Sequence, residues 1–222
     1  MRFMLLKKEW LAKSNFYLIL DTSVLGFRRL REIAAQLSPL GVDIVQLRDK
    51  HCSDEEYVER ANCIAEIVQD KALFVINDRV HLAKHINPDG LHLGQEDASI
   101  EKARDIVGYD KLVGLSCQTA KHLERAQERG ADYIGFGSVY KTFTKPDREP
   151  MDLSFLENSQ RRCHVPLFAI GGITLENITP LIERGVRRVA LTRAILEADN
   201  RIETLKRFKQ VLAQATRAQS IN

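Results

Sequence analysis

The sequence predicts a single α/β domain built as a (β/α)8 barrel with a short helical extension at its N-terminus. Eight β-type apolar runs alternate with helical patterns over roughly 200 residues, and no linker-like segment separates them. Polar or charged residues directly follow nearly every run, as at the catalytic rim of barrel enzymes. A doubly wound open sheet is the alternative, because periodicity alone does not count strands. We expect one domain over residues 1–222, with an extension at 1–15, a barrel core at 16–196 and a C-terminal helix at 199–219.

The bulk composition is that of an ordinary globular protein. Hydrophobic residues make up 44% of the chain and charged residues 28%, and the net charge of +3 is too small to predict binding to nucleic acid or a membrane surface. The four cysteines have no CxxC pair and no zinc-like spacing, so reduced thiols are expected. The apolar stretch at the N-terminus is too short for a signal sequence or a membrane span. We therefore expect a cytoplasmic location.

The first half of the chain predicts an N-terminal helix and four strands. The helix should cover the bottom of the barrel through an apolar face made of Leu5, Leu6, Trp10 and Leu11. Strands are predicted at 16–20, 42–47, 73–76 and 90–93. Helices are predicted at 27–40, after a capping box of Ser53 and Glu56, at 80–85, and from Ser99 onward.

The second half predicts four more strands, at 111–115, 133–139, 165–170 and 188–192. Helices are predicted from Thr119 to Gly130, at 153–161 and at 175–184, the last with Pro180 as an alternative start. A long polar loop occupies 140–150. The helix from residue 199 carries one apolar stripe, and its basic outer face is read as solvated surface.

Two neighbouring apolar runs each end in acidic residues. Asn77 and Asp78 follow the run at 73–76, and Asp97 follows the run at 90–93. If both runs are adjacent parallel strands, their carboxyl ends bring Asp78 and Asp97 together, and such a pair suits Mg²⁺. Each acid could instead cap the helix that follows it. The pairing favours the metal.

Cationic side chains follow the second strand. In QLRDK, strand alternation directs Gln46, Arg48 and Lys50 to one side. With a metal ion and Lys145, they could hold a polyphosphate. For Arg48 or Lys50 alone, a surface ion pair with Asp49 or Asp54 is the alternative.

A Gly-Gly turn in AIGGIT follows the seventh strand. Gly171 and Gly172 would expose backbone N-H groups where barrels bind phosphate, and a short helix after the eighth strand could add more. A tight turn that needs positive φ explains two glycines equally well.

Three further candidates are weaker. His81 and His85 have i, i+4 spacing, but HLAKH lacks the glutamate of HExxH, which favours a surface or capping role over zinc. His92 could touch the site, although packing is favoured. Cys117 has no histidine or aspartate at a specific spacing, so a nucleophilic role is not expected.

Taken together, QLRDK, INDRVHLA, GLHLGQED, GADYIGFGSVYKTFTK and AIGGIT, in this order and spacing, closely resemble the thiamine-phosphate synthase (thiamine-phosphate pyrophosphorylase) family over about residues 16–196. The resemblance implies a TIM barrel and a transferase of thiamine biosynthesis. Such enzymes join 4-amino-2-methyl-5-(diphosphooxymethyl)pyrimidine to a methylthiazole phosphate with Mg²⁺, releasing diphosphate and thiamine monophosphate. The partners would be small phosphorylated substrates, and homo-oligomerisation is left open.

The resemblance also assigns roles to individual residues. Asp78 and Asp97 would hold the metal. The pyrimidine diphosphate would be bound by Gln46, Arg48, Lys50, Asn77, Ser116 and Lys145, of which Arg48, Lys50, Ser116 and Lys145 would be catalytic. The thiazole phosphate would be bound by Thr142, Thr144, Gly172, Thr192 and Arg193. In the family mechanism, the pyrimidine methylene sheds diphosphate to give a stabilised cation that the thiazole nitrogen captures, so no nucleophilic side chain is needed.

Two positions depart from the family pattern. Arg193 stands where the family usually has serine, which replaces a small phosphate contact with a bulky cation. Gln118 stands where histidine is common. In the related thiazole tautomerases that histidine is the acid-base group, and glutamine cannot exchange protons at neutral pH. Gln118 therefore argues against the tautomerase alternative, and a non-catalytic barrel that binds thiamine phosphate is the other alternative.

Overall fold

The strands form a closed parallel barrel. The computed structural model describes residues 2–142 and 149–219, with side chains from residue 6 to residue 217 of that range, and its strands pair in sequence order until β8 closes on β1. The strands are β1 (Phe16–Asp21), β2 (Ile44–Arg48), β3 (Leu73–Asn77), β4 (Gly90–Leu93), β5 (Leu112–Cys117), β6 (Tyr133–Phe136), β7 (Leu167–Ile170) and β8 (Val189–Leu191). The predicted (β/α)8 barrel is confirmed, and the open-sheet alternative is wrong.

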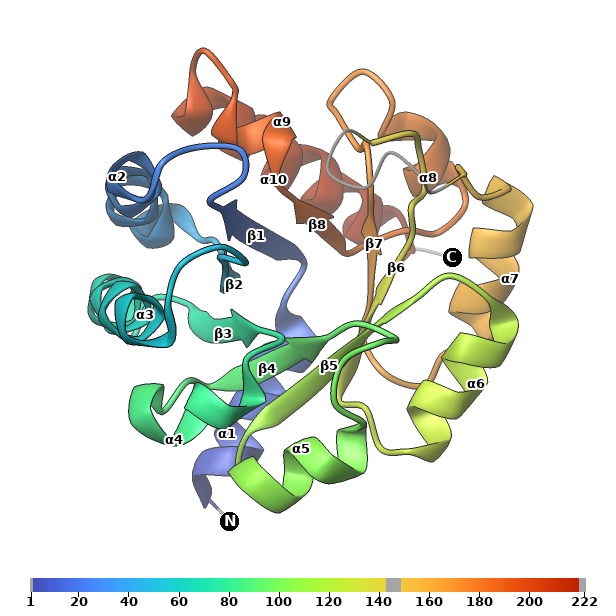
Figure 1. Cartoon of the computed structure of the whole chain (residues 1–222). Helices are drawn as coiled ribbons and strands as arrows, with labels where there is room; N and C mark the ends of the chain where they lie inside the picture. The colour runs from blue at the N-terminus through green and yellow to red at the C-terminus, as the bar shows by residue number, and fades with distance from the viewer. Residues whose placement is uncertain (1, 143–148, 220–222) are drawn as a thin grey trace.

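Helices surround the ring of strands (Figure 1). They are α1 (Arg2–Lys13), α2 (Phe27–Leu37), α3 (Asp54–Val68), α4 (Ala83–Ile86), α5 (Ile100–Val107), α6 (Ala120–Glu128), α7 (Leu153–Arg162), α8 (Thr179–Glu183), α9 (Arg193–Leu196) and α10 (Arg201–Gln219), with 3-10 turns η1 (Ser38–Leu40) and η2 (Val80–Leu82). Within residues 2–142 and 149–219, no helix combines the length and the apolar character needed to cross a membrane.

Side-chain caps begin three helices where the sequence predicts them. The hydroxyl of Ser53 accepts the amide of Glu56 at the start of α3, and Ser99 and Thr119 cap α5 and α6 in the same way. Each cap satisfies an amide that the first helical turn leaves without a partner. The helix predicted at 175–184 starts later, at Thr179, because Asn177 accepts the amide of Thr174 and closes a turn there.

Alternate strand residues fill the lower part of the barrel. Phe168 packs edge to face against Tyr17 and Tyr133, whose rings are tilted against each other, and the ring centroids are 5.5–6.1 Å apart. Room for the Tyr133 ring comes from Gly114, because a Cβ there would overlap the ring. Leu11 of α1 joins this cluster from below. Bulky side chains therefore close the bottom and leave the polar strand ends open at the top.

The apolar face predicted for the N-terminal helix is only partly right. Leu11 is buried, but Leu6 and Trp10 are 53% and 38% exposed, and the side chain of Leu5 lies outside the described part. Ion pairs from Lys7 to Asp89 (3.2 Å) and from Lys8 to Asp132 (3.0 Å) hold α1 instead. Among the described side chains of α1, Leu11 packs against the barrel, Lys7 and Lys8 form ion pairs with it, and Leu6 and Trp10 are exposed.

Candidate active site

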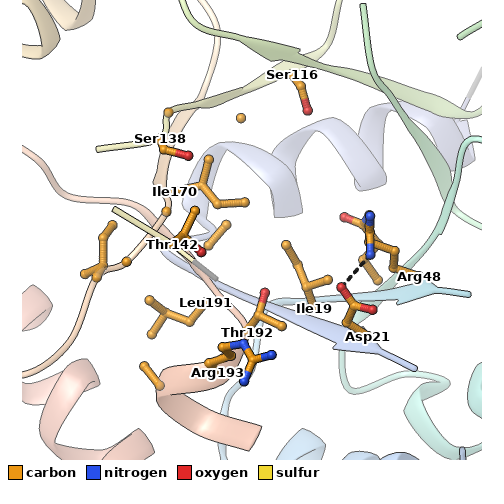
Figure 2. Close-up of a pocket in the computed structure, with 18 of the residues that line it drawn as sticks. Ile19, Asp21, Arg48, Ser116, Ser138, Thr142, Ile170, Leu191, Thr192 and Arg193 are labelled. Carbon is orange, nitrogen blue, oxygen red and sulfur yellow. Dashed lines mark hydrogen bonds and ion pairs between the residues drawn. The ribbon is translucent and has the colours of Figure 1, made fainter. Parts of the chain in front are cut away.

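A cavity of about 370 Å³ opens at the carboxyl ends of the strands. It contains many of the residues that the sequence nominates, and its walls come from strands and loops far apart in the chain. The nominated residues that line it are Gln46, Arg48, Asn77, Ser116, Thr142, Gly172, Thr192 and Arg193. In Figure 2, Arg48 and Asp21 lie on one side of the cavity, and Ser138 and Thr142 lie on the other.

On the first side, Arg48 forms an ion pair with Asp21 at 2.6 Å. Asp21 ends β1 directly opposite Arg48 at the end of β2, so the pairing register of the two strands creates the contact. The surface ion pair considered for Arg48 is therefore wrong, since Asp49 pairs with Arg60 instead. Asp21 is buried, and a buried carboxylate needs a cationic partner, which Arg48 supplies.

Hydrogen bonds fix the amides on the floor of the cavity. The hydroxyl of Tyr17 donates to Oε1 of Gln46 at 2.8 Å, and Nε2 of Gln46 donates to Oδ1 of Asn77 at 2.8 Å. Burial raises the pKa of Tyr17 well above its ordinary value, and the neighbouring Tyr133 raises it further, so the hydroxyl stays a donor. The orientation of both amides is therefore set before any ligand binds.

His92 faces the cavity, and the expectation that it merely packs is wrong. Its Nε2 lies 2.9 Å from Oγ of Ser116, and its Nδ1 lies 3.3 Å from the hydroxyl of Tyr133. Strand alternation turns the ring inward, and Gly135 on β6 leaves space for it, because a Cβ at 135 would come within 3.1 Å of the imidazole. The imidazole thus links a cavity hydroxyl to the aromatic layer below.

Asp78 and Asp97 come together at the rim. The two carboxylates are near enough for Asp78 to affect the pKa of Asp97, and Nζ of Lys50 lies 3.1 Å from Asp78. Burial raises the pKa of Asp97, and the neighbouring carboxylate of Asp78 raises it further, while the Gly94 amide acts to lower it. The nearby Lys50 opposes the rise too.

The capping alternative for the two acids is wrong. Ser99 is the cap of α5, while Asp97 accepts the amide of Gly94 at 2.6 Å. The turn η2 begins after Arg79 without a side-chain cap, and Asp78 itself has a left-handed φ of 59°. A non-glycine residue in this conformation is uncommon and is often found at functional sites.

The acid pair has the chemistry of a divalent-cation site. Two neighbouring carboxylates repel each other when both are ionised, and a cation between them relieves this repulsion. Across the described residues, 2–142 and 149–219, no group of three or more acidic, histidine or cysteine side chains could hold a metal. A metal ion at Asp78 and Asp97 would therefore take its remaining oxygens from water or a ligand, as Mg²⁺ does when it binds phosphates.

On the other side of the cavity, the Gly-Gly turn is compatible with both interpretations, a phosphate-binding site and a tight turn that needs positive φ. Gly171 and Gly172 have φ of 105° and 64°, which favours glycine, and a Cβ on Gly172 would overlap the carbonyl oxygen of Lys141. The turn is thus sterically required, and it also lines the cavity. Thr192 and Arg193 open the short helix α9 beside it, where Arg193 pairs with Glu197.

The remaining nominated residues fall outside the cavity or outside the described part. Lys50, Asp78 and Asp97 lie at the rim rather than among the lining residues, and Thr144 and Lys145 lie outside the described residues. Besides Asp21, Ser138 and Lys141 line the cavity. The sequence does not predict them as site residues, because nothing in their local pattern distinguishes them from other loop residues.

Two of the three weaker candidates, the His81 and His85 pair and Cys117, lie outside the cavity lining. His81 is exposed and pairs with Asp54 at 2.8 Å, and neither it nor His85 belongs to a metal cluster within the described residues. Cys117 is fully buried, and burial, with a small effect from Cys163, raises the pKa of its thiol to about 12. A thiol with this pKa is not a nucleophile at neutral pH.

Comparison with known proteins points to one family. Residues 16–195 match the family described as thiamine monophosphate synthase. The thiamine-phosphate synthase of Synechococcus sp. (strain WH7803) is 39% identical over 87% of this chain and 56% of its own length, and that of Lawsonia intracellularis (strain PHE/MN1-00) is 36% identical over 91% of this chain and 94% of its own length. The chain spans about half the length of the Synechococcus relative and of several similar ones.

A solved structure shows the same likeness. The thiamine phosphate pyrophosphorylase from Pyrococcus furiosus superposes with a TM-score of 0.81 and 27% identity, covering 94% of this chain and 98% of its own.

Proposed function

Because the chain belongs to the thiamine monophosphate synthase family, we propose that it condenses 4-amino-2-methyl-5-(diphosphooxymethyl)pyrimidine with a methylthiazole phosphate to give thiamine monophosphate and diphosphate. The observation that carries the proposal is the two-sided cavity, with the Arg48 and Asp21 pair beside the acidic rim on one side and the Gly-Gly turn on the other. A reaction between two phosphorylated molecules needs two such anion-binding regions that face one space.

The diphosphate end of the pyrimidine substrate belongs at the first side. Arg48 can hold two phosphate oxygens at once, and Lys50 offers a point charge beside Asp78. Asp78 and Asp97 would hold Mg²⁺, which would neutralise the charge that grows on the leaving diphosphate. The floor amides of Gln46 and Asn77 face the same space and can orient the aminopyrimidine ring.

The thiazole phosphate belongs at the second side. Backbone amides around Gly172, the hydroxyls of Thr142 and Thr192 and the cation of Arg193 line that part of the cavity. Arg193 adds a charge-assisted contact where a serine would offer only a hydroxyl. Thr144 and Lys145 are expected to complete the two phosphate sites.

The chemistry needs no nucleophilic side chain. The bond between the methylene carbon and the diphosphate oxygen breaks with its electrons leaving on the diphosphate, and the ring-stabilised cation is captured by the lone pair of the thiazole nitrogen. Arg48 and Lys50 stabilise the departing charge, and Ser116, whose hydroxyl is held by His92, donates to it or to the ring. The cavity would hold the methylene carbon and the thiazole nitrogen in one relative orientation, which lowers the entropic part of the barrier.

The direct test is a diphosphate-release assay with both substrates, with and without Mg²⁺. Release that requires both substrates and the metal, together with thiamine monophosphate as product, is the expected result. The variants Asp78→Ala and Asp97→Ala should abolish it, and undiminished activity in both would refute the metal assignment. Isomerisation of a thiazole carboxylate phosphate without the pyrimidine, or tight thiamine phosphate binding without diphosphate release, would refute the synthase.

We also propose a cytoplasmic location, with small phosphorylated metabolites as the only partners that the site requires. The four free thiols suit a reducing compartment. Fractionation of the source cells with an antibody to this chain would test the location.

A further inference from the structure

The side chain of Arg79 turns away from the cavity, although Asp78 precedes it directly. Its Nη2 donates to the carbonyl oxygen of Cys52 at 2.7 Å and to that of Asp49 at 3.3 Å, and its Nη1 pairs with Asp54. Asp49 and Cys52 lie in the loop that joins β2 to α3, and Asp54 is the first residue of α3. One guanidinium therefore holds both ends of the loop.

The same guanidinium is fixed from below by an aromatic ring. Arg79 lies over the ring of Tyr57 with 4.7 Å from Cζ to the centroid. The Tyr57 hydroxyl donates to the carbonyl of Leu47 at 3.0 Å and accepts the amide of Asn77 at 3.3 Å. Arg79 is thus stacked on a residue that itself joins the ends of β2 and β3.

The loop under Arg79 carries Lys50. This residue lies between the two carbonyls that Arg79 binds, and its ammonium sits 3.1 Å from Asp78. We propose that Arg79 is a positioning residue that clamps the loop of residues 49–52, so that Lys50 and Asp78 present their charges to a metal-bound diphosphate. The inference rests on the proposed function and concerns a residue that touches neither substrate.

Two substitutions can test whether Arg79 acts through the shape of its guanidinium or only through its positive charge. The guanidinium is planar and donates to two carbonyls while stacking on a ring, which a lysine ammonium on a flexible stem does not reproduce. Replacement by methionine keeps the apolar stem over Tyr57 and removes every donor. The pair of variants Arg79→Met and Arg79→Lys therefore tests the forked contact itself.

The experiment is calorimetric titration of the full chain with inorganic diphosphate in the presence of Mg²⁺, and separately with the thiazole phosphate. Both Arg79→Met and Arg79→Lys should bind the metal-dependent diphosphate about tenfold or more weakly, as for loss of hydrogen bonds to a charged group. Their affinity for the thiazole phosphate should stay within about twofold. Arg161→Met, which removes an exposed pair with Glu157, serves as the matched control and should change neither affinity.

Each outcome decides the proposal. Wild-type affinity for the metal-dependent diphosphate in folded Arg79→Lys would overturn the clamp even if Arg79→Met failed to fold. Equal weakening of both ligands would overturn it too, since that pattern indicates general destabilisation. If the wild-type protein binds diphosphate with Mg²⁺ but makes no thiamine monophosphate, the proposed function is refuted and the role of Arg79 is not. If the enzyme is active and both Arg79 variants bind diphosphate as the wild type does, the role of Arg79 alone is refuted.

Discussion

The carboxylate of Asp21 lies 2.6 Å from a guanidinium nitrogen of Arg48, at the point where β1 and β2 end in register. Asp21 is only 1% exposed, and its other oxygen accepts the amide and the hydroxyl of Ser23 at 2.9 and 2.7 Å. The hydrogen bonds from Ser23 therefore fix the carboxylate of Asp21, and this carboxylate orients the guanidinium of Arg48. A guanidinium oriented before the substrate arrives loses less side-chain entropy on binding a phosphate.

The substitution Asp21→Asn should raise the KM for the pyrimidine diphosphate about tenfold. Arg48 keeps its charge in this variant but loses the partner that aims it into the cavity, and hydrogen bonds to charged groups are worth about 1.5–3 kcal/mol. Steady-state kinetics with each substrate varied in turn would measure the KM for the pyrimidine diphosphate. Glu32→Gln, which alters the exposed pairs with Arg28 and Arg29, is the control and should leave KM unchanged. An unaltered KM in a folded Asp21→Asn protein would contradict the orienting role.

The substitution Gly172→Ala should destabilise the fold and weaken thiazole phosphate binding. The substitution Gly185→Ala should destabilise the fold only slightly and leave thiazole phosphate binding unchanged. Both glycines have positive φ, 64° and 88°, so each alanine costs about 1 kcal/mol in backbone strain. A Cβ at 185 meets nothing within 4 Å, while one at 172 overlaps the carbonyl of Lys141. The clash adds about 1–3 kcal/mol.

Urea unfolding and the KM for the thiazole phosphate would separate the two glycines. Equal losses of unfolding free energy in the two variants would show that the close approach at 172 relaxes without cost. A thiazole phosphate KM that stays at the wild-type value in Gly172→Ala would remove this turn from the phosphate site.

The substitution Cys117→Ala should leave turnover within about twofold of wild type. Burial raises the pKa of this thiol to about 12, and its Sγ donates to the carbonyl of His122 at 3.4 Å, so almost no thiolate exists at pH 7. Iodoacetamide should accordingly label Cys117 slowly in the native protein and quickly in urea, as followed by mass spectrometry. A large fall in kcat with an intact fold would revive the nucleophile that the mechanism omits.

The sequence pattern predicted those features of the fold that depend on residues close together in the chain. Alternating apolar runs located the strands, and Ser53, Ser99 and Thr119 marked helix starts, because a strand needs a buried face and a helix start needs an acceptor for its free amides. The meeting of Asp78 and Asp97 was also predictable, since adjacent parallel strands end at the same rim.

Pairing between distant segments was not predictable in the same way. The contact of Asp21 with Arg48 depends on the register of β1 and β2, and the inward position of His92 depends on the space left by Gly135. The donors of Arg79 reach a loop that no spacing rule connects to it. In each case the decisive partner lies about 25 or more residues away, where sequence periodicity carries no information.

Asp49 is a buried acid whose titration should affect folding. Burial acts to raise the pKa of Asp49, but hydrogen bonds from Arg60, Thr22 and Cys52 outweigh it, with a further contribution from the His51 amide, so its pKa lies below the ordinary value. A lowered pKa in the folded state means that the unfolded chain binds more protons in the acid range. The stability from this carboxylate is then fully present above the unfolded pKa and is lost as the pH falls through the folded pKa.

The substitution Asp49→Asn should therefore lower the free energy of unfolding by about 1–3 kcal/mol at pH 7, since it removes the charge that Arg60 pairs with in a buried setting. Below about pH 4 the difference from wild type should shrink, because the wild-type carboxylate becomes protonated and loses the same interaction. Urea denaturation at a series of pH values would measure both proteins, with Asp105→Asn on the exposed face of α5 as a control that should differ little from wild type throughout. A difference that stayed constant or widened with acidity would mean that the Asp49 carboxylate does not gain stability from its charge.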